Sequence, residues 1–240
     1  MTRTCQDRPF GNGPVELVDC ERHGAGSGAE LFIVEGESAA LAVARVRDPR
    51  VQAVLPMQGK PLNATKATAR RVTAQPLYRA LAAATGTGMG GAFLREGLRY
   101  ERILLLTDPD ADGIHCGVLL AGFFLAWMRP LLEEGLVGWV RPPWGEVVVA
   151  GEAPRIGLSE EELSGLSAAA RERGPVVVRR FRGLAAIDER LLASRCLEPA
   201  GRRVDPLGVR AVEAMVRLLA EAIPEGSGDA GGRADPPSIH

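Results

Sequence analysis

The chain alternates short apolar runs with longer segments rich in alanine and leucine. Residues 31–34, 51–57 and 102–107 are apolar runs bounded by glycine or polar residues, and each has the length of a buried strand. Residues 38–46 and 77–84 have the composition of helices. Strands that alternate with helices form βαβ units, so the pattern predicts an α/β fold with a mostly parallel, Rossmann-like sheet flanked by helices.

The second half of the chain has a different texture. A long apolar helix is expected to run to about Glu134, and Ser159 followed by Glu162 has the spacing of a capping box. The further expectations are strands at 137–140 and 176–181, and helices at 159–173, 189–196 and 206–222.

These patterns predict four segments. Residues 1–28 form a polar, glycine-rich lead-in that is partly disordered, and residues 29–150 form the α/β domain. Residues 151–223 form a small, helical C-terminal extension, and residues 224–240 form a tail of Gly, Pro and Asp that is expected to be disordered.

Composition excludes some classes of protein. Hydrophobic residues make up 46% and charged residues 25%, which is typical of a globular protein, and the net charge of −1 shows no overall basic excess. The longest apolar stretch, 117–128, is too short to span a bilayer, and the N-terminus has no signal-peptide core, which predicts a cytoplasmic protein. The four cysteines have no CxxC spacing, so neither a zinc site nor a redox pair is expected.

Three aspartates directly follow the strongest predicted strand. Asp108, Asp110 and Asp112 alternate along the chain before Gly113, so they point to one side of an extended segment. Crowded carboxylates repel one another, and burying them without a cation costs several kcal/mol. A hard cation such as Mg²⁺, which binds one or two carboxylates together with water and phosphate oxygens, removes that cost.

Two other interpretations fit this segment less well. An EF-hand calcium loop also opens with D-x-D-x-D-G, but it needs a glutamate at its twelfth position, where this chain has Leu119. A solvated acidic turn is the simpler alternative. The position of the segment argues against it, because ligands of open α/β sheets bind at the carboxyl ends of the strands. Glu35 ends another apolar run, and if the two strands are neighbours it faces the aspartates.

Several motifs together resemble one family. The run from Glu30 to Ala39 resembles ELFIVEGDSA, and 52–63 is similar to QAILPLRGKILN. Residues 85–90 resemble a GTGIG loop, 98–115 resemble LRYHKIIIMTDADVDGAH, and 180–184 resemble the start of RYKGLGEM. In this order, they are similar to the Toprim domain and C-terminal end of type IIA topoisomerase B subunits, the gyrase B and topoisomerase IV B kind.

The resemblance implies a role for individual residues. Glu35 would be the general acid/base and a metal ligand, Asp108 and Asp110 would be the principal Mg²⁺ ligands, and Asp112 would complete the site. Mn²⁺ or Ca²⁺ would be possible substitutes. The DNA-binding residues would be Lys60, Arg180 and Arg182, although Lys60 also fits a plain exposed turn.

The resemblance also implies partners. They are DNA, a gyrase A-like subunit that supplies the catalytic tyrosine, and a separate ATPase subunit, because the 240 residues hold no match to the ATPase and transducer regions and are not expected to bind ATP. No membrane partner is expected. The chain departs from the family where Gly117 replaces an arginine and where Ala185 and Ala186 replace Gly-Glu.

The sequence leaves the activity open among four alternatives. The chain is a topoisomerase module, an autonomous Mg²⁺-dependent nuclease that activates water, a non-catalytic regulator that binds DNA or the gyrase A-like partner, or a fragment of a longer protein.

Overall fold

A computed structural model describes residues 16–222 of the protein. Its main sheet has the strand order β2-β1-β3-β4-β8, in which β1, β2, β3 and β4 are parallel and β8 is antiparallel to β4. The predicted mostly parallel sheet is therefore confirmed. Its strands are β1 (Glu30–Glu35), β2 (Gln52–Met57), β3 (Arg102–Leu106), β4 (Val137–Arg141) and β8 (Arg203–Pro206).

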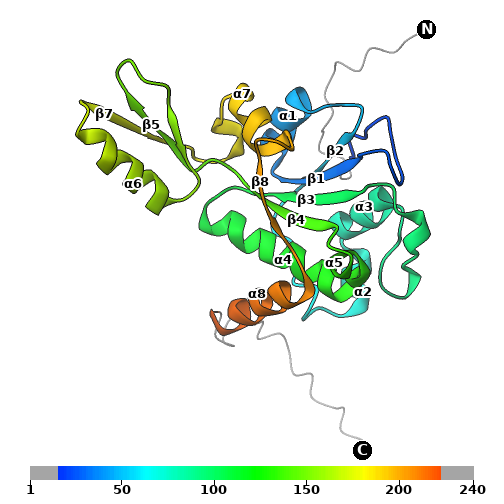
Figure 1. Ribbon diagram of the computed structural model, residues 1–240. Helices are drawn as coiled ribbons and strands as arrows, with labels where there is room; N and C mark the ends of the chain where they lie inside the picture. Colours follow the sequence, from blue (N-terminus) through cyan, green and yellow to red (C-terminus); the bar gives the residue numbers. More distant parts are fainter. Residues whose placement is uncertain (1–15, 223–240) are drawn as a thin grey trace, which may run out of the picture.

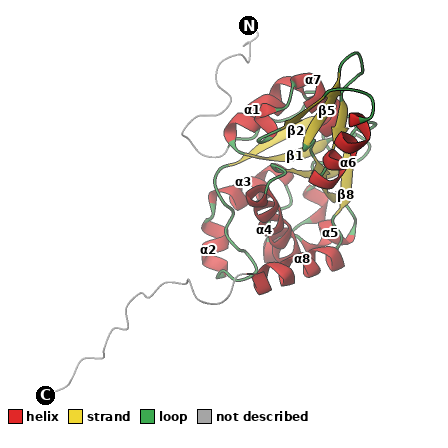
Figure 2. Ribbon diagram, turned by 90° about the vertical axis from the view of Figure 1, so that its left-hand side faces the viewer, coloured by secondary structure: helices red, strands yellow, loops and turns green. Residues whose placement is uncertain are grey.

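Helices cover both faces of this sheet (Figures 1 and 2). On one face lie α1 (Glu37–Val46), α7 (Glu189–Leu192) and the π-helical turn η4 (Ala193–Leu197). On the other lie α2 (Ala69–Ala74), α3 (Pro76–Thr85), α4 (Ala111–Trp127), α5 (Arg129–Glu133) and α8 (Val209–Ala222). Three short 3-10 turns complete the body, η1 (Gly90–Ala92), η2 (Arg95–Gly97) and η3 (Leu184–Ala186).

Alternation along β1 divides the core in two. Leu31 and Ile33 pack in the cluster on the α3 and α4 side, whereas Phe32 and Val34 pack in the cluster on the α1 and α7 side. All four side chains are fully buried. A parallel strand that is apolar on both faces must be covered on both faces, which explains the two helical layers.

A second, smaller unit projects from the body (Figure 1). Strands β5 (Gly145–Val149), β6 (Arg155–Gly157) and β7 (Val176–Arg180) form an antiparallel sheet in the order β6-β5-β7. Helix α6 (Glu160–Arg171) packs on it through Leu163 and Ala170. The Ser159 hydroxyl caps this helix by accepting from the Glu162 N–H at 3.1 Å, as the spacing predicts, but the Glu162 carboxylate accepts from Leu158 N–H.

The structure differs from the sequence-based expectations in several places, and the elements that were not expected include α2 and β5. The long apolar helix is interrupted at Met128 and resumes as α5, because Pro130 cannot donate a backbone hydrogen bond within a continuous helix. Residues 151–223 contain the predicted strand β7, and they also contain β6 and β8, which were not expected. The expected helix start at Pro206 is wrong, because Pro206 ends β8 and α8 begins at Val209.

The predicted lead-in and tail fall mostly outside the described residues. Among the residues that the structure describes, no helix combines the length and hydropathy needed to cross a bilayer.

Candidate metal centre

Glu35 and Asp108 lie side by side at the carboxyl edge of the main sheet. Strands β1 and β3 are parallel neighbours with Val34 opposite Leu106, so the residues that follow each strand emerge at the same edge. The Asp108 N–H donates a hydrogen bond to Glu35 Oε2 at 3.1 Å. This hydrogen bond confirms the expectation that the two acidic segments face one another.

Backbone amides hold one oxygen of each leading aspartate. Asp108 Oδ1 accepts from the Leu184 N–H at 2.8 Å, and Asp110 Oδ1 accepts from the Gly113 N–H at 2.8 Å as the N-cap of α4. In both residues this leaves Oδ2 as the oxygen available to a ligand. An amide-anchored carboxylate with one free oxygen is well prepared to bind a cation, because its orientation is already fixed.

Asp112 follows the N-cap Asp110 on α4. It is exposed in the first turn of α4, where its negative charge interacts favourably with the helix N-terminus. Among residues 16–222, the four predicted acids do not supply three oxygens within 4.8 Å of one another. The arrangement suits an ion that takes one or two carboxylates directly and fills its other positions with water or phosphate, as Mg²⁺ does.

Burial disfavours the charged forms of the two central acids. Burial, followed by the nearby charges of Asp108 and Asp110, raises the pKa of Glu35, although the Asp108 N–H and the Cys116 thiol oppose this. Burial and then the charge of Asp110 also raise the pKa of Asp108, against the Leu184 hydrogen bond.

The negative charge of these acids is not neutralised by a basic side chain within residues 16–222. In that range, none of the four acids forms an ion pair with a lysine, arginine or histidine. Hard oxygen donors that are partly buried, negatively charged and unpaired are the donor set that a divalent cation stabilises. The residues present therefore fit Mg²⁺.

A cleft of about 450 Å³ opens beside the acids. Its wall includes Glu35 and Asp108, the start of α1, and the η3 segment that carries Gly183 and Leu184. Arg182 also lines it, so this predicted DNA-binding residue shares the cleft with Glu35 and Asp108. Glu37 and Ser38 line it too, and neither was predicted from the sequence.

The other two predicted DNA-binding residues are placed differently. Lys60 is exposed on the turn after β2. Burial lowers the pKa of His115 in α4, and the positive charge of Lys60 lowers it further, so Lys60 lies on the α4 side of the acids. Arg180 is engaged by Glu160, with Nη2 2.5 Å from Oε1. Because Glu160 also accepts from Trp144 Nε1 at 2.8 Å, Arg180 is held within the small second unit.

Gly183 lies against the Asp108 carboxylate, a contact that the sequence motif alone did not reveal. Its φ of 131° is unfavourable for residues with a side chain, and a Cβ there would lie 2.8 Å from Asp108 Oδ2. We expect Gly183→Ala to displace the Asp108 carboxylate and weaken Mg²⁺ binding by about tenfold or more, the effect of disturbing an outer-shell partner. Titration of the thermal midpoint with Mg²⁺ measures this. Gly174→Ala, at another positive φ of 145° with open space around it, is the matched control.

Both tyrosines of the chain are buried. The Tyr78 hydroxyl donates to the carbonyl of Leu62, and the Tyr100 hydroxyl donates to Asp19 Oδ1 at 2.7 Å. Burial raises the pKa of each hydroxyl, most of all that of Tyr100, where the Asp19 carboxylate adds to the effect. Neither hydroxyl is therefore placed or activated to attack a phosphodiester.

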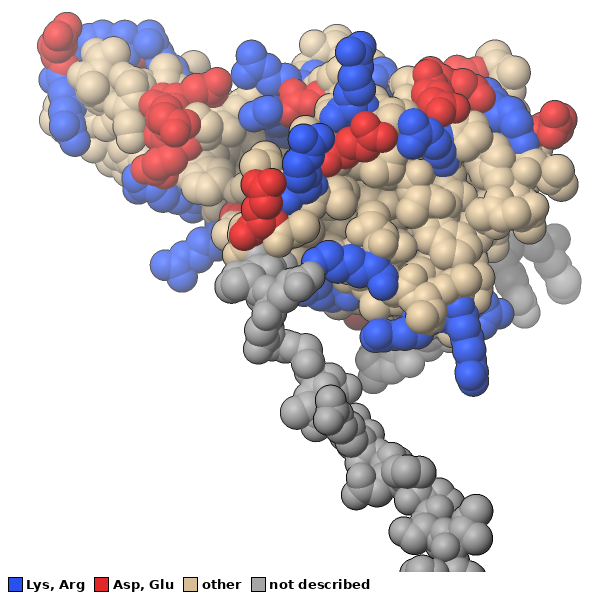
Figure 3. Space-filling model, turned by 90° about the horizontal axis from the view of Figure 1, so that it is seen from below, with Lys and Arg blue, Asp and Glu red and all other residues tan. Residues whose placement is uncertain are grey.

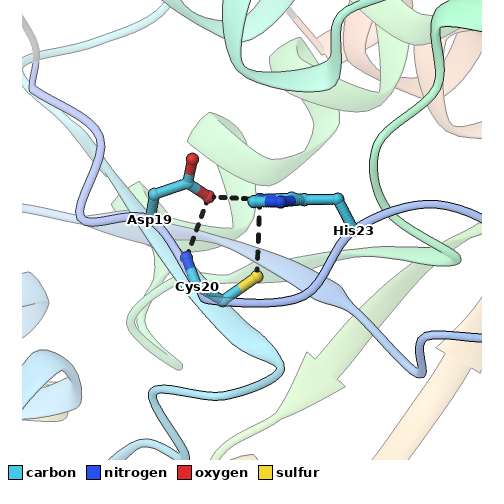
Figure 4. Close-up of side chains that lie close together, drawn as sticks. All are labelled: Asp19, Cys20 and His23. Carbon is cyan, nitrogen blue, oxygen red and sulfur yellow. Dashed lines mark hydrogen bonds and ion pairs between the residues drawn. The ribbon is translucent and has the colours of Figure 1, made fainter.

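A second cluster of ligand-type side chains precedes β1 (Figure 4). Potential ligand atoms of Asp19, Cys20 and His23 lie within 4.8 Å of one another. The spacing of the cysteines alone did not predict this cluster. His23 Nε2 is 2.9 Å from Asp19 Oδ1 and 3.8 Å from Cys20 Sγ.

Arg99 already fills this cluster with positive charge. Its Nη2 forms an ion pair with Asp19 and lies 2.8 Å from His23 Nε2. Burial raises the pKa of Asp19, but hydrogen bonds from His23, Tyr100 and Arg99 outweigh it and bring the value to about 2. The cluster therefore ties the segment before β1 to the residues before β3 without requiring a metal ion.

Positive charge is dispersed over the face that carries α8. Figure 3 shows lysine and arginine interleaved there with acidic groups, with no continuous basic surface among the described residues on that face. Salt-dependent attraction to a DNA backbone therefore has little support on this face, and the cleft beside Arg182 is the better candidate for a local phosphate contact.

Comparison with known proteins agrees with this geometry. Residues 30–139 match the family model described as Toprim domain, which spans β1 to β4 and contains Glu35, Asp108, Asp110 and Asp112. The DNA gyrase B protein of Thermus thermophilus is 39% identical over 193 residues, which are 79% of this chain and 30% of that protein.

Two further relatives give the same picture. The DNA gyrase B proteins of Halalkalibacterium halodurans and Haloferax volcanii are 35% and 36% identical, over 80% and 86% of this chain. The matches cover 30% and 32% of those proteins, so the chain spans about a third of the length of these relatives.

Proposed function

We propose that this protein holds the Mg²⁺ used by a type IIA topoisomerase to cleave and religate DNA reversibly, because residues 30–139 are a Toprim domain and about 80% of the chain is homologous to DNA gyrase B. Toprim domains bind Mg²⁺ as a class. The observation that supports the proposal most is the partly buried pair of Glu35 and Asp108 at the edge of the sheet, which forms no ion pair with any basic residue between 16 and 222.

We assign the ligands from the free oxygens. Asp108 and Asp110 would hold the ion through their Oδ2 atoms while backbone amides keep the Oδ1 atoms fixed. Asp112 would add negative charge from the start of α4 without a direct bond. When bound, Mg²⁺ would polarise the scissile phosphate and stabilise the leaving oxygen. Mn²⁺ and Ca²⁺ fit the same oxygen donors and are useful probes.

Glu35 would move the proton. A general acid/base works best when its pKa approaches the working pH, and burial beside Asp108 raises the pKa of Glu35 in that direction. Its carboxylate is steadied by the Asp108 N–H. We propose that Glu35 donates a proton to the 3′ oxygen as it departs and takes it back as the oxygen attacks during religation.

The nucleophile would come from a partner. Tyr78 and Tyr100 are the two tyrosines of the chain, and both are buried with their hydroxyls bonded. A covalent attachment of DNA to tyrosine therefore needs a tyrosine other than these two, which we propose that a gyrase A-like subunit supplies. ATP-driven strand passage would require a separate ATPase segment or protein, and the action on DNA would take place in the cytoplasm.

Reconstitution tests this proposal. The full chain is mixed with supercoiled plasmid and a gyrase A protein, and cleaved DNA is trapped with denaturant in Mg²⁺, Mn²⁺ or Ca²⁺. We expect metal-dependent cleavage with DNA joined covalently to the gyrase A protein. Cleavage by the chain alone without a covalent adduct would establish an autonomous nuclease instead, and binding to gyrase A without any cleavage would establish a regulator.

Arg182 and Arg180 form a matched pair for a test of DNA contact. Arg182 lines the acidic cleft, whereas Arg180 is held by Glu160. We expect Arg182→Ala to weaken DNA binding by the reconstituted complex and to reduce the salt slope of log K by about one, as for one lost phosphate contact. Arg180→Ala should change the slope by much less. Equal losses from both variants, measured by fluorescence anisotropy between low and moderate salt, would refute the assignment of Arg182.

A further inference from the structure

Trp139 and Gly117 fit together as a pair across β4 and α4. An ideal Cβ on Gly117 would lie 2.0 Å from Trp139 Cζ2 and 2.3 Å from Cη2. Such distances are impossible for a real side chain, so the indole ring occupies the space that any side chain at position 117 would need. At this contact β4 supplies the Trp139 side chain, and α4 supplies only the backbone of Gly117.

The indole also makes a directed contact to the acidic loop. Trp139 Nε1 donates to Thr107 Oγ1 at 3.2 Å. Thr107 is 1% exposed and is the residue between β3 and Asp108, so its position determines where the Asp108 backbone begins. Trp139 stands opposite Leu105 on the neighbouring strand, which brings its ring to the same carboxyl edge as Asp108.

The other side of this contact is open. A cavity of about 460 Å³ is bounded by Trp139 together with Thr107, Asp108, Pro109 and Ile114. Ile114, on the first turn of α4, is 52% exposed and therefore provides little packing to hold the loop from that side. The loop is thus supported by the indole on one side and by the Leu184 amide of η3 on another.

We infer that Trp139 is a positioning residue for the metal-binding loop: packed on the bare backbone of Gly117, it holds Thr107 through its indole N–H and so sets the place of Asp108. This inference rests on the proposed function of the acids. It also predicts that positions 117 and 139 are coupled, so that a side chain at 117 is tolerated only when the ring at 139 is made smaller.

Trp139→Phe is the direct test, because it keeps an aromatic ring on β4 and removes the N–H. We expect the Mg²⁺ concentration that gives half of the thermal stabilisation of the full chain to rise about three- to tenfold, the effect of one lost hydrogen bond. Thr107→Val should act similarly, and the double variant should be no worse than the stronger single variant. Trp127→Phe is the control, since Trp127 packs on Gly90, away from the acids.

The outcomes separate the inference from the proposed function. If wild type shows no Mg²⁺-dependent shift, the proposed metal site fails. If wild type shows the shift and Trp139→Phe shows the same half-point, even with a lower metal-free midpoint, Trp139 is only structural and the inference is overturned.

A second comparison tests the coupling of the two positions. Gly117→Arg restores the residue type that the family resemblance places there, yet it should lower the midpoint strongly and abolish the Mg²⁺ response. Gly117→Arg combined with Trp139→Val should recover a folded protein with a measurable Mg²⁺ half-point. Failure of the double variant to improve on Gly117→Arg in midpoint would contradict the coupling.

Discussion

Replacing Asp108 with asparagine should abolish the stabilisation of the protein by Mg²⁺ while slightly raising its stability without metal. The two effects have one cause. Burial and the charge of Asp110 disfavour ionised Asp108, so a neutral side chain relieves the metal-free protein. The asparagine Oδ1 can still accept the Leu184 N–H, so the local fold is preserved.

The expected size follows from ligand linkage. At a Mg²⁺ concentration about 100 times the dissociation constant, binding adds about 2.7 kcal/mol to the free energy of unfolding. For a chain of this size that corresponds to a rise in thermal midpoint of about 5–10 °C. Asp108→Asn should lose this rise, and its metal-free midpoint should increase by about 2 °C. Asp112→Asn, at an exposed position, should keep most of the Mg²⁺ response.

The pH dependence has a defined sign. Glu35 and Asp108 have pKa values raised above their ordinary 4.5 and 3.8. In the metal-free protein, their contribution to the free energy of unfolding is therefore present at acid pH. It is lost as the pH rises through the raised pKa values. Protons compete with Mg²⁺ for the same carboxylates. The rise in thermal midpoint caused by Mg²⁺ should therefore become smaller as the pH falls towards the raised pKa values. A Mg²⁺ shift that stays constant down to about pH 4, near the ordinary carboxylate pKa, would contradict these assignments.

Replacing Glu35 with glutamine should reduce the rates of cleavage and religation far more than it reduces Mg²⁺ binding. Glutamine keeps an oxygen that accepts the Asp108 N–H, but it cannot give or take a proton. Loss of a general acid/base costs about 10²- to 10⁴-fold in rate. Rapid-quench measurements on the reconstituted complex would report this loss.

Glu37→Gln is the matched control for Glu35→Gln. Glu37 lines the same cleft, two residues further along, in the first turn of α1, and has no hydrogen bond to the acidic loop among the described residues. It should retain the rate within a few fold. If the two variants slow the reaction equally, the general acid/base assignment to Glu35 is wrong and the cleft acts through its overall charge.

Local sequence pattern was enough to locate the acidic edge. Glu35 and Asp108 each follow a short apolar run, and parallel strands deliver such residues to one edge, as the hydrogen bond between them confirms. The sheet could be predicted for a related reason, because strands that are buried on both faces are continuous apolar runs.

Contacts between distant segments could not be predicted in this way. The amide of Leu184 reaches Asp108 from 76 positions away, and neither residue type nor spacing reveals that contact. The approach of Trp139 to Gly117 is likewise a matter of how α4 packs on β4. Strand β8 was missed because it pairs only at an edge and is half polar, so its pattern is weak.

The proposed chemistry depends on one divalent ion bound between Glu35 and the aspartates, and a crystal structure of the full chain grown with Mn²⁺ tests it most directly. We predict a single strong anomalous peak in contact with the carboxylates of Asp108 and Asp110 and beside Glu35, lost in crystals of Asp108→Asn. An acidic edge without a peak, or a peak only between Asp19, Cys20 and His23 with Arg99 displaced, would contradict the presence of that ion.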